Sequence, residues 1–220
     1  MTRVLVVGAH PDDEVLGCGG TIARHAAEGD LVSALLIADG ETSRGAGNIP
    51  RRRQAAQTAA TALGLESVTT LDYPDNRLDS VALLDIVQSI ERVIAEKRPD
   101  VVYTHHAGDL NIDHAIVHRA VLTACRPATA GGVRAIYAFE VPSSTEWGAT
   151  TLAPFVPTRF VDISATLVTK RGALECYSEE MRAAPHPRSL VGVEALARLR
   201  GHQIGCAAAE AFMVIREIVR

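Results

Sequence analysis

Three side chains with catalytic potential stand together near the start of the chain: His10, Asp12 and Asp13. They follow an apolar run at residues 4–7, which breaks at Gly8. A run of Val and Leu bounded by Gly and Pro predicts a buried strand of a parallel sheet. Ligands of open α/β sheets bind just past the carboxyl ends of strands. We therefore expect an imidazole and two carboxylates at the functional edge of such a sheet.

This set of side chains suits a hydrolytic metal site. Imidazole and carboxylate are ligands that zinc accepts, and His10 and Asp13 can supply two of them. Iron(II) accepts the same N/O ligands. Asp12 is then left over, and a spare carboxylate beside a metal-activated water can act as a general base.

A catalytic zinc usually takes three protein ligands, so a third must come from elsewhere. The best candidate region is residues 105–114, because it directly follows an apolar strand predicted at 101–104 and emerges at the same sheet edge as His10. His114 stands at the start of a predicted helix, where the backbone is fixed. Asp113 can cap that helix or orient a neighbouring polar side chain.

The elements needed to hold these residues alternate along the first part of the chain. Strands are predicted at 4–7, 31–37, 68–71 and 101–104, and helices at 14–28, 51–63, 81–97 (with Ser80 as N-cap) and 113–125. Such alternation predicts right-handed crossovers and a mostly parallel sheet with helices on both faces. The predicted fold class is therefore α/β.

The pattern changes after about residue 130. Residues 135–141 and 159–163 read as late strands, and residues 164–180 and 188–211 as helices. Residues 142–157 are rich in Ser, Thr and Pro and are expected to form a loop over the site. With no linker or repeat in view, we expect one domain over residues 1–220.

Composition narrows the class of function. The chain has 220 residues, a net charge of −4 and 47% hydrophobic residues, as in an ordinary soluble enzyme. This charge gives no reason to expect a nucleic acid or an anionic membrane as partner. No apolar run has the length of a membrane span, and a strand predicted at the N-terminus leaves no room for a secretory signal. Together with four scattered cysteines, expected to be free thiols, this favours the cytoplasm.

The sequence resembles the PIG-L/LmbE-like family of zinc-dependent N-deacetylases. The most specific motif is His-Pro-Asp-Asp-Glu at residues 10–14, and the resemblance covers nearly the whole chain. Supporting motifs are Arg51-Arg52-Arg53, Tyr73-Pro74-Asp75-Asn76-Arg77, the stretch 109–114, Glu140 to Trp147, Pro185 to Ser189, and Ala209 to Phe212. The family fold is a Rossmann-like three-layer sandwich, in agreement with the α/β prediction.

The resemblance implies an activity and assigns residues to it. Family members remove acetyl groups from N-acetylglucosamine-type sugars in larger conjugates. The family pattern places zinc on the residues that match His10, Asp13 and His114, and the general base on the residue that matches Asp12. The implied partner is a small-molecule N-acetylated sugar conjugate.

One position departs from the family pattern. Several members carry His-x-Asp-His at the later motif, and the first of these histidines helps to stabilise the oxyanion or to protonate the leaving amine. This chain has Asn111 there, which can donate a hydrogen bond but is no acid near neutral pH. The acid is then Asp12 after it has accepted a proton, which we rank first, or another histidine. His186 is the next candidate, followed by His105 and His106.

Five further residues are predicted to contact the substrate. Arg51 opens a helix, where a cation is disfavoured unless it meets an anion, so we expect it to bind a phosphate or carboxylate. Asp75 and Asn76, just beyond a strand, are expected to hold sugar hydroxyls. Trp147 lies in a polar loop and fits stacking on a sugar face, with Glu146 beside it for hydroxyls.

Two other functions compete with deacetylation. One is a related zinc amidase that cleaves a larger acyl group. The other is a Rossmann-like nucleotide-binding module without hydrolysis. The positions of His10, Asp12, Asp13 and His114 argue against it, since dinucleotide binding needs none of them at that spacing. The apolar run at residues 212–219 is a candidate interface for a homo-oligomer.

Overall fold

The computed structural model describes residues 1–45, 47–127, 132–148 and 151–219. Seven strands form one sheet in the order β3-β2-β1-β4-β5-β7-β6. All pairs from β3 to β5 are parallel, whereas β7 runs antiparallel to both of its neighbours. The strands are β1 (Arg3–Gly8), β2 (Leu31–Ala38), β3 (Ser67–Tyr73), β4 (Val101–His105), β5 (Ala135–Phe139), β6 (Arg159–Asp162) and β7 (Ala209–Glu217).

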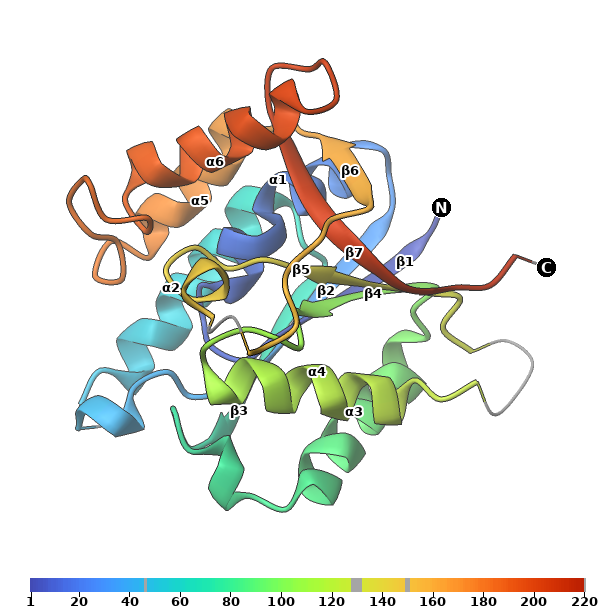
Figure 1. Cartoon of the computed structure of the whole chain (residues 1–220). Coiled ribbons are helices and arrows are strands. Elements are labelled where there is room, and N and C mark those ends of the chain that lie inside the picture. The colour runs from blue at the N-terminus through green and yellow to red at the C-terminus, as the bar shows by residue number, and fades with distance from the viewer. Residues whose placement is uncertain (46, 128–131, 149–150, 220) are drawn as a thin grey trace.

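Helices cover both faces of this sheet, so the predicted three-layer α/β sandwich is confirmed (Figure 1). One face carries α1, α2, α5 and α6, and the other carries α3 and α4. The helices are α1 (Asp13–Ala27), α2 (Ile49–Leu63), α3 (Leu83–Lys97), α4 (Ile112–Ala124), α5 (Leu167–Cys176) and α6 (Leu190–His202). Short 3₁₀ turns lie at Thr42–Arg44, Leu78–Ser80 and Thr145–Trp147.

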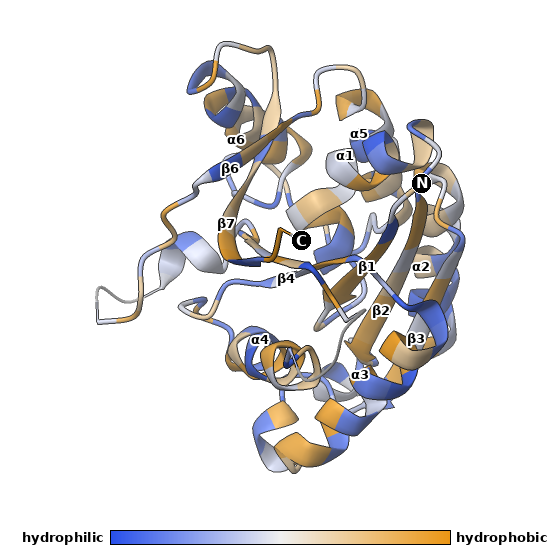
Figure 2. Ribbon diagram, turned by 90° about the vertical axis from the view of Figure 1, so that its right-hand side faces the viewer, coloured by the Kyte–Doolittle hydropathy of each residue, from blue (hydrophilic) through white to orange (hydrophobic). Residues whose placement is uncertain are grey.

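The alternation of side chains along β1 builds a core on each side of the sheet. Val4 and Val6 pack into the cluster under α1 and α2, while Leu5 and Val7 pack into the cluster under α3 and α4. Successive residues of a strand point to opposite faces, so a strand buried on both faces is apolar throughout. Figure 2 shows this as the hydrophobic colour of the inner strands.

Glycines in the early turns of α1 let the helix pack closely on its neighbours. A Cβ at Gly17 would stand 2.3 Å from the Phe139 ring, and a Cβ at Gly20 would stand 2.7 Å from Ile163. Since these distances are too short for carbon atoms, only glycine permits the approach. The beginning of α1 is thereby held against β1 and β5, which fixes the loop that carries His10 and Asp12.

The structure corrects the reading of the C-terminal part. The helix predicted at 188–211 ends at His202, and Ala209 to Ala211 belong to β7. The run at 212–219, predicted as a candidate interface, lies mostly within the same strand, between β5 and β6. Phe212 within this run is fully buried, whereas Val214 and Val219 are 39% and 92% exposed, so the interface itself stays a prediction. The error arose because small apolar residues such as Ala fit both helix and buried strand.

Two smaller predictions also need correction. Ser80 does not cap α3, which begins at Leu83; its hydroxyl donates to the Arg77 carbonyl within the 3₁₀ turn instead. The helix predicted at 164–180 is limited to α5, at Leu167–Cys176. Within the described residues, no helix is long and apolar enough to cross a membrane.

Candidate metal centre

Three buried side chains converge past the carboxyl ends of β1 and β4. His10 lies in the loop between β1 and α1, and Asp13 is the first residue of α1. His114 lies in the first turn of α4. Asp13 Oδ2 lies 3.3 Å from His10 Nδ1 and 3.4 Å from His114 Nε2. Zinc ligands at about 2.0–2.1 Å from the metal are separated by roughly 3.4 Å in a tetrahedral site. The donor set and its spacing therefore fit a zinc ion.

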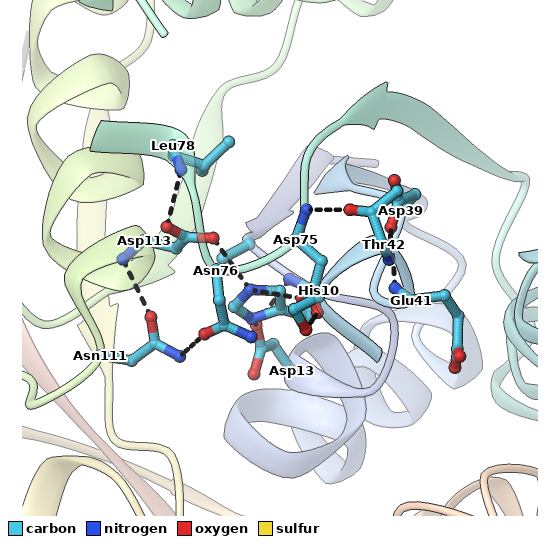
Figure 3. Close-up of polar contacts among 12 residues, drawn as sticks. His10, Asp13, Asp39, Glu41, Thr42, Asp75, Asn76, Leu78, Asn111 and Asp113 are labelled. Carbon is cyan, nitrogen blue, oxygen red and sulfur yellow. Dashed lines mark hydrogen bonds and ion pairs between the residues drawn. The ribbon is translucent and has the colours of Figure 1, made fainter. Parts of the chain in front are cut away.

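The far side of the His10 ring faces carboxylates. Its Nε2 lies 3.2 Å from Asp113 Oδ2 and 3.4 Å from Asp75 Oδ1 (Figure 3). Asp113 Oδ1 in turn accepts the backbone N–H of Leu78 at 3.0 Å. A carboxylate behind a metal-binding histidine fixes its tautomer and orientation. Of the two roles predicted for Asp113, the structure shows the orienting one.

His114 is supported in the same way from its other side. Its Nδ1 lies 3.0 Å from Asp109 Oδ1. Asp109 is itself buried and accepts hydrogen bonds from the hydroxyls of Ser144 and Thr145. Although burial raises the pKa of Asp109, the bonds from His114 and these hydroxyls lower it to about 2. Ser144 and Thr145, within the predicted 142–157 loop, are thus tied to His114 through one carboxylate.

The pKa values of His10 and His114 indicate that protons occupy the centre before a metal binds. Burial lowers the pKa of both ligand histidines, but the surrounding carboxylates outweigh it. The pKa of His10 rises to about 10, with Asp113 and Asp13 as hydrogen-bond partners, and that of His114 rises to about 9 beside Asp13 and Asp109. A site that attracts protons this strongly also attracts a cation in their place.

His105 lies against this cluster without being a free ligand. Its ring stacks on that of His114 at 3.9 Å between centroids, and its Nε2 lies 3.3 Å from Asp13 Oδ2. That nitrogen already accepts the backbone N–H of Ala9 at 2.8 Å. Burial, together with the charge of His114, lowers the pKa of His105 to about 4, so the ring is neutral. His106 points elsewhere and contacts the Ala153 carbonyl.

Asp12 lies beside the ligands and differs from them in its partners. Its carboxylate is 3.4 Å from Arg188 Nη1 and 3.9 Å from Arg52 Nη2. Burial raises the pKa of Asp12 to about 6, although both arginines lower it. Its φ of 127° lies in the left-handed region that favours glycine. Strain of this kind concentrates at functional sites.

Asn111 has two roles in the fold. Its side-chain oxygen accepts the backbone N–H of Asp113 at 2.9 Å, which caps α4, and its Nδ2 donates to Asn76 Oδ1 at 3.1 Å. Figure 3 shows this chain of contacts from Asp113 through Asn111 to Asn76, beside His10. One amide hydrogen of Asn111 is left for a further acceptor. Asp75 is buried next to the same ring and also accepts the Ser43 hydroxyl.

The remaining predicted residues lie farther out. Arg51 is exposed on α2 and pairs with Glu179 at 2.6 Å, while its neighbour Arg52 is the arginine that reaches Asp12. Trp147 is 49% exposed, and its ring meets the edge of His186 at 5.7 Å between centroids.

The hydrogen bonds of two loop residues are local. Glu146 accepts backbone N–H groups of Ser143 and Ser144 and so shapes residues 143–146. His186 Nδ1 accepts the backbone N–H of Arg188.

Sequence reasoning missed the groups that surround the ligands. Arg52 and Arg188 both stand inside quoted motifs, yet nothing in the local pattern marks them as partners of Asp12. Asp109 also lies in a quoted stretch, but only the tertiary structure shows it behind His114. A buried charge must be paired, so an arginine in an otherwise apolar helix face is the one signal that could have identified Arg52.

Comparison with known proteins agrees with this site. The sequence model of the PIG-L family, described as GlcNAc-PI de-N-acetylase, matches residues 5–125, a segment that contains His10, Asp13 and His114. The chain belongs to the PIG-L family of deacetylases. A relative in Escherichia coli K12, called uncharacterized deacetylase YaiS, is 34% identical over 146 residues, which are 64% of this chain and 75% of that protein.

Other relatives of this PIG-L family member have a named substrate. The 1D-myo-inositol 2-acetamido-2-deoxy-alpha-D-glucopyranoside deacetylase of Saccharomonospora viridis is 29% identical, with 83% of this chain and 86% of that protein covered.

Two solved structures share the fold of this PIG-L family member over its whole length. The conserved protein TT1542 of Thermus thermophilus has a TM-score of 0.81 at 26% identity, with 97% of that chain covered. The 4-carboxy-2-hydroxymuconate hydratase GalB of Pseudomonas putida KT2440 also has a TM-score of 0.81, at 25% identity with 98% covered. The same scaffold therefore supports both deacetylases and a hydratase.

Proposed function

We propose that the protein removes the acetyl group from an N-acetylated amino sugar, of the N-acetylglucosamine type, within a larger conjugate. The observation that carries this proposal is the buried cluster of His10, Asp13 and His114 with the extra carboxylate of Asp12 beside it. Amide hydrolysis needs a polarised carbonyl, an activated water and a group that moves its proton. The cluster and Asp12 can meet these three needs together.

His10, Asp13 and His114 would hold the metal, with zinc as the first choice and iron(II) as the alternative. When bound there, the ion would polarise the acetamide carbonyl and lower the pKa of water. Asp113 and Asp109 hold the two imidazole rings in the orientation in which one nitrogen of each faces Asp13. The ring positions are thus set by the protein, and each carboxylate keeps a proton on the nitrogen that faces it, which leaves the other nitrogen for the ion.

Asp12 would act as the general base and then as the acid. Its carboxylate accepts a proton from the attacking water and returns it to the nitrogen of the leaving amine. Arg188 and Arg52 favour its ionised form, while burial favours the protonated one, so it can serve both steps. Asn111 would donate its free amide hydrogen to the oxygen on which negative charge develops. His186, beside Trp147, is the second candidate for the acid.

The substrate would lie across the mouth formed by the β3–α3, β4–α4 and 142–157 segments. We assign Asp75 and Asn76 to sugar hydroxyls, because Asp75 lies next to His10 and Asn76 lies next to Asn111. Trp147 would stack on a sugar face, with Glu146 offering its remaining acceptor capacity to hydroxyls. Arg51 is the weakest of these assignments, since Glu179 already neutralises it.

Exposed apolar residues favour a large conjugate over a free sugar. Leu110 and Ile112 flank Asn111 and are 53% and 51% exposed, and Trp147 is exposed to a similar degree. Their loops are joined through Asp109, which accepts from Ser144 and Thr145. Apolar side chains gathered at the mouth of a site mark a ligand-binding surface. The part of the conjugate beyond the sugar would cover them.

A second candidate function is the hydration of a carbon–carbon double bond. It is favoured by the likeness to the hydratase GalB, which extends over the whole chain at 25% identity. Activated water is the nucleophile in both reactions, so the metal cluster alone does not separate them. A zinc amidase that releases a larger acyl group is the third outcome to be tested.

One experiment decides among these functions. Purified protein is freed of metal, reloaded with one equivalent of zinc and incubated with a panel of N-acetylated sugar conjugates, N-acylated analogues and unsaturated carboxylates. We expect zinc-dependent release of acetate and an equal amount of new primary amine. Release of only longer acids would assign the amidase activity. Loss of the double bond, without any acid released, would assign the hydratase and overturn the proposal.

A further inference from the structure

Two buried side chains next to the site have no place in the reaction as described. Glu14 is the second residue of α1, and Tyr177 directly follows α5; both are 2% exposed. The Tyr177 hydroxyl donates to Glu14 Oε1 at 2.7 Å. The other oxygen of the same carboxylate, Oε2, accepts the backbone N–H of Asp12 at 3.1 Å. A hydrogen-bonded chain thus runs from α5 to the backbone of Asp12.

The conformation of Asp12 gives this chain its importance. Asp12 is the N-cap of α1, a position where an aspartate normally accepts helix N–H groups with its side chain. Here the side chain makes no such bond, and φ is 127°. The carboxylate is turned instead toward Arg188 and Arg52. A backbone in this region persists only where its surroundings hold it.

The segment that carries Tyr177 acts on Asp12 from a second direction. Glu180, three residues later, pairs with Arg52 at 2.6 Å, and its backbone N–H donates to the Tyr177 carbonyl. Arg52 is in turn an ion-pair partner of Asp12. One turn after α5 therefore contacts the peptide of Asp12 through Glu14 and the carboxylate of Asp12 through Arg52.

We propose that Glu14 and Tyr177 are a positioning pair, which holds the strained peptide of Asp12 so that its carboxylate faces Arg188 and Arg52 instead of capping its own helix. The inference rests on the proposed function, since it assumes that Asp12 moves a proton. Neither residue touches the substrate. Their effect is to keep Asp12 from turning back to cap its own helix, where its carboxylate would be lost to the reaction.

The test compares two buried tyrosines. Tyr177→Phe removes only the hydroxyl that holds Glu14, whereas Tyr103→Phe removes a hydroxyl that contacts His25, away from the site. We expect Tyr177→Phe to lower kcat about tenfold to a hundredfold, as for a displaced catalytic group, with KM and zinc content unchanged. Tyr103→Phe should leave kcat as in the wild type. Equal kcat values in the two variants would overturn the proposal.

A second measurement does not depend on activity. The exchange rate of the Asp12 amide hydrogen is measured by NMR in the metal-free protein. We expect faster exchange in Tyr177→Phe than in the wild type and no change in Tyr103→Phe. A general loss of stability would raise exchange in the core strands as well, and such a uniform rise would assign Tyr177 a merely structural role and overturn the proposal.

Conservative and disruptive changes at Glu14 complete the test. Glu14→Gln keeps an oxygen for the Asp12 N–H and an amide that can donate to the Tyr177 oxygen. This variant should therefore keep most of the wild-type kcat. Glu14→Leu should lose both of these hydrogen bonds. If the Leu variant does not fold, the Tyr177→Phe comparison still decides. If the wild type shows no deacetylation at all, the proposed function fails, while the amide exchange still tests the positioning pair.

Discussion

Asp12 shows how a residue's chemistry depends on its partners rather than on its type. Asp12 and Asp13 are adjacent carboxylates, yet Asp13 is surrounded by His114, His105 and His10. The charge of His114 and the hydrogen bond from His10 lower the pKa of Asp13 well below its usual range despite burial, whereas burial raises that of Asp12 to about 6. One carboxylate is thereby suited to hold a cation, and the other to exchange a proton.

The first prediction concerns Asp12 itself. Asp12→Asn keeps the size of the side chain and removes its capacity to take a proton. We expect bound zinc to remain at wild-type stoichiometry and kcat to fall about 10²–10⁴-fold, the usual contribution of a general base. Metal analysis and acetate release measure the two quantities. Asp79→Asn, on an exposed turn, is the control, and near-normal turnover of Asp12→Asn would contradict the assignment.

A second prediction at this scale follows from the proton affinity of the ligands. With pKa values of about 10 and about 9, His10 and His114 are both protonated near neutral pH in the metal-free protein. Binding of zinc should therefore release about two protons, and affinity should rise with pH, by up to roughly a hundredfold per unit. Calorimetry in buffers of different ionisation enthalpy measures the release. Binding without proton release would contradict the ligand set.

At the scale of elements, one residue at the start of α4 both caps the helix and belongs to the candidate site. Asn111 caps the helix that carries His114, and its amide faces Asn76. Asp113, in the first turn of the same helix, orients His10, which follows β1. The helix is thus a rigid link between His10 and His114.

Variants of Asn111 separate these two roles. Asn111→Ser keeps an N-cap acceptor for the Asp113 N–H but loses the amide donor, so the free energy of unfolding should be unchanged while kcat falls about a hundredfold. Asn111→Ala should also lose about 1 kcal/mol of stability. Urea unfolding and steady-state kinetics provide the comparison. Full activity of the Ser variant would show that the amide donor is not used.

At the scale of the molecule, charged contacts join segments that are distant in the chain. Glu180 receives Arg44 and Arg52 at 2.7 and 2.6 Å, which ties the segment after α5 to α2 and to the loop after β2. Burial raises the pKa of Glu180, but these two arginines lower it from 4.5 to about 2. An acid whose pKa is lowered by folding stabilises the fold above its unfolded-state pKa. That stability is lost as pH falls toward 2.

The stability of a Glu180→Gln variant tests this link. Its deficit in the free energy of unfolding should be about 2 kcal/mol smaller at pH 3 than at pH 7, because the wild type alone loses the contribution of the ionised carboxylate. Glu175→Gln, which removes an exposed partner of Arg171, should stay within about 1 kcal/mol of the wild type at both values. A deficit of Glu180→Gln that does not change with pH would contradict the pKa shift.

The sequence by itself determined the α/β alternation, the positions of most strands and two of the three residues of the candidate metal cluster. These features are local: apolar runs between Gly and Pro, and a motif of five consecutive residues at 10–14. A motif can be read wherever neighbours in the chain are also neighbours in space, as for His10, Asp12 and Asp13.

Only the tertiary structure decided the groups that give those residues their properties. It selected Arg52 rather than Arg51 as the partner of Asp12, placed Asp109 behind His114, and inserted β7 between β5 and β6. Each of these contacts joins segments far apart in the chain. Their pairing is set by sheet order and helix packing, which no local pattern records, and burial then fixes which charges must meet.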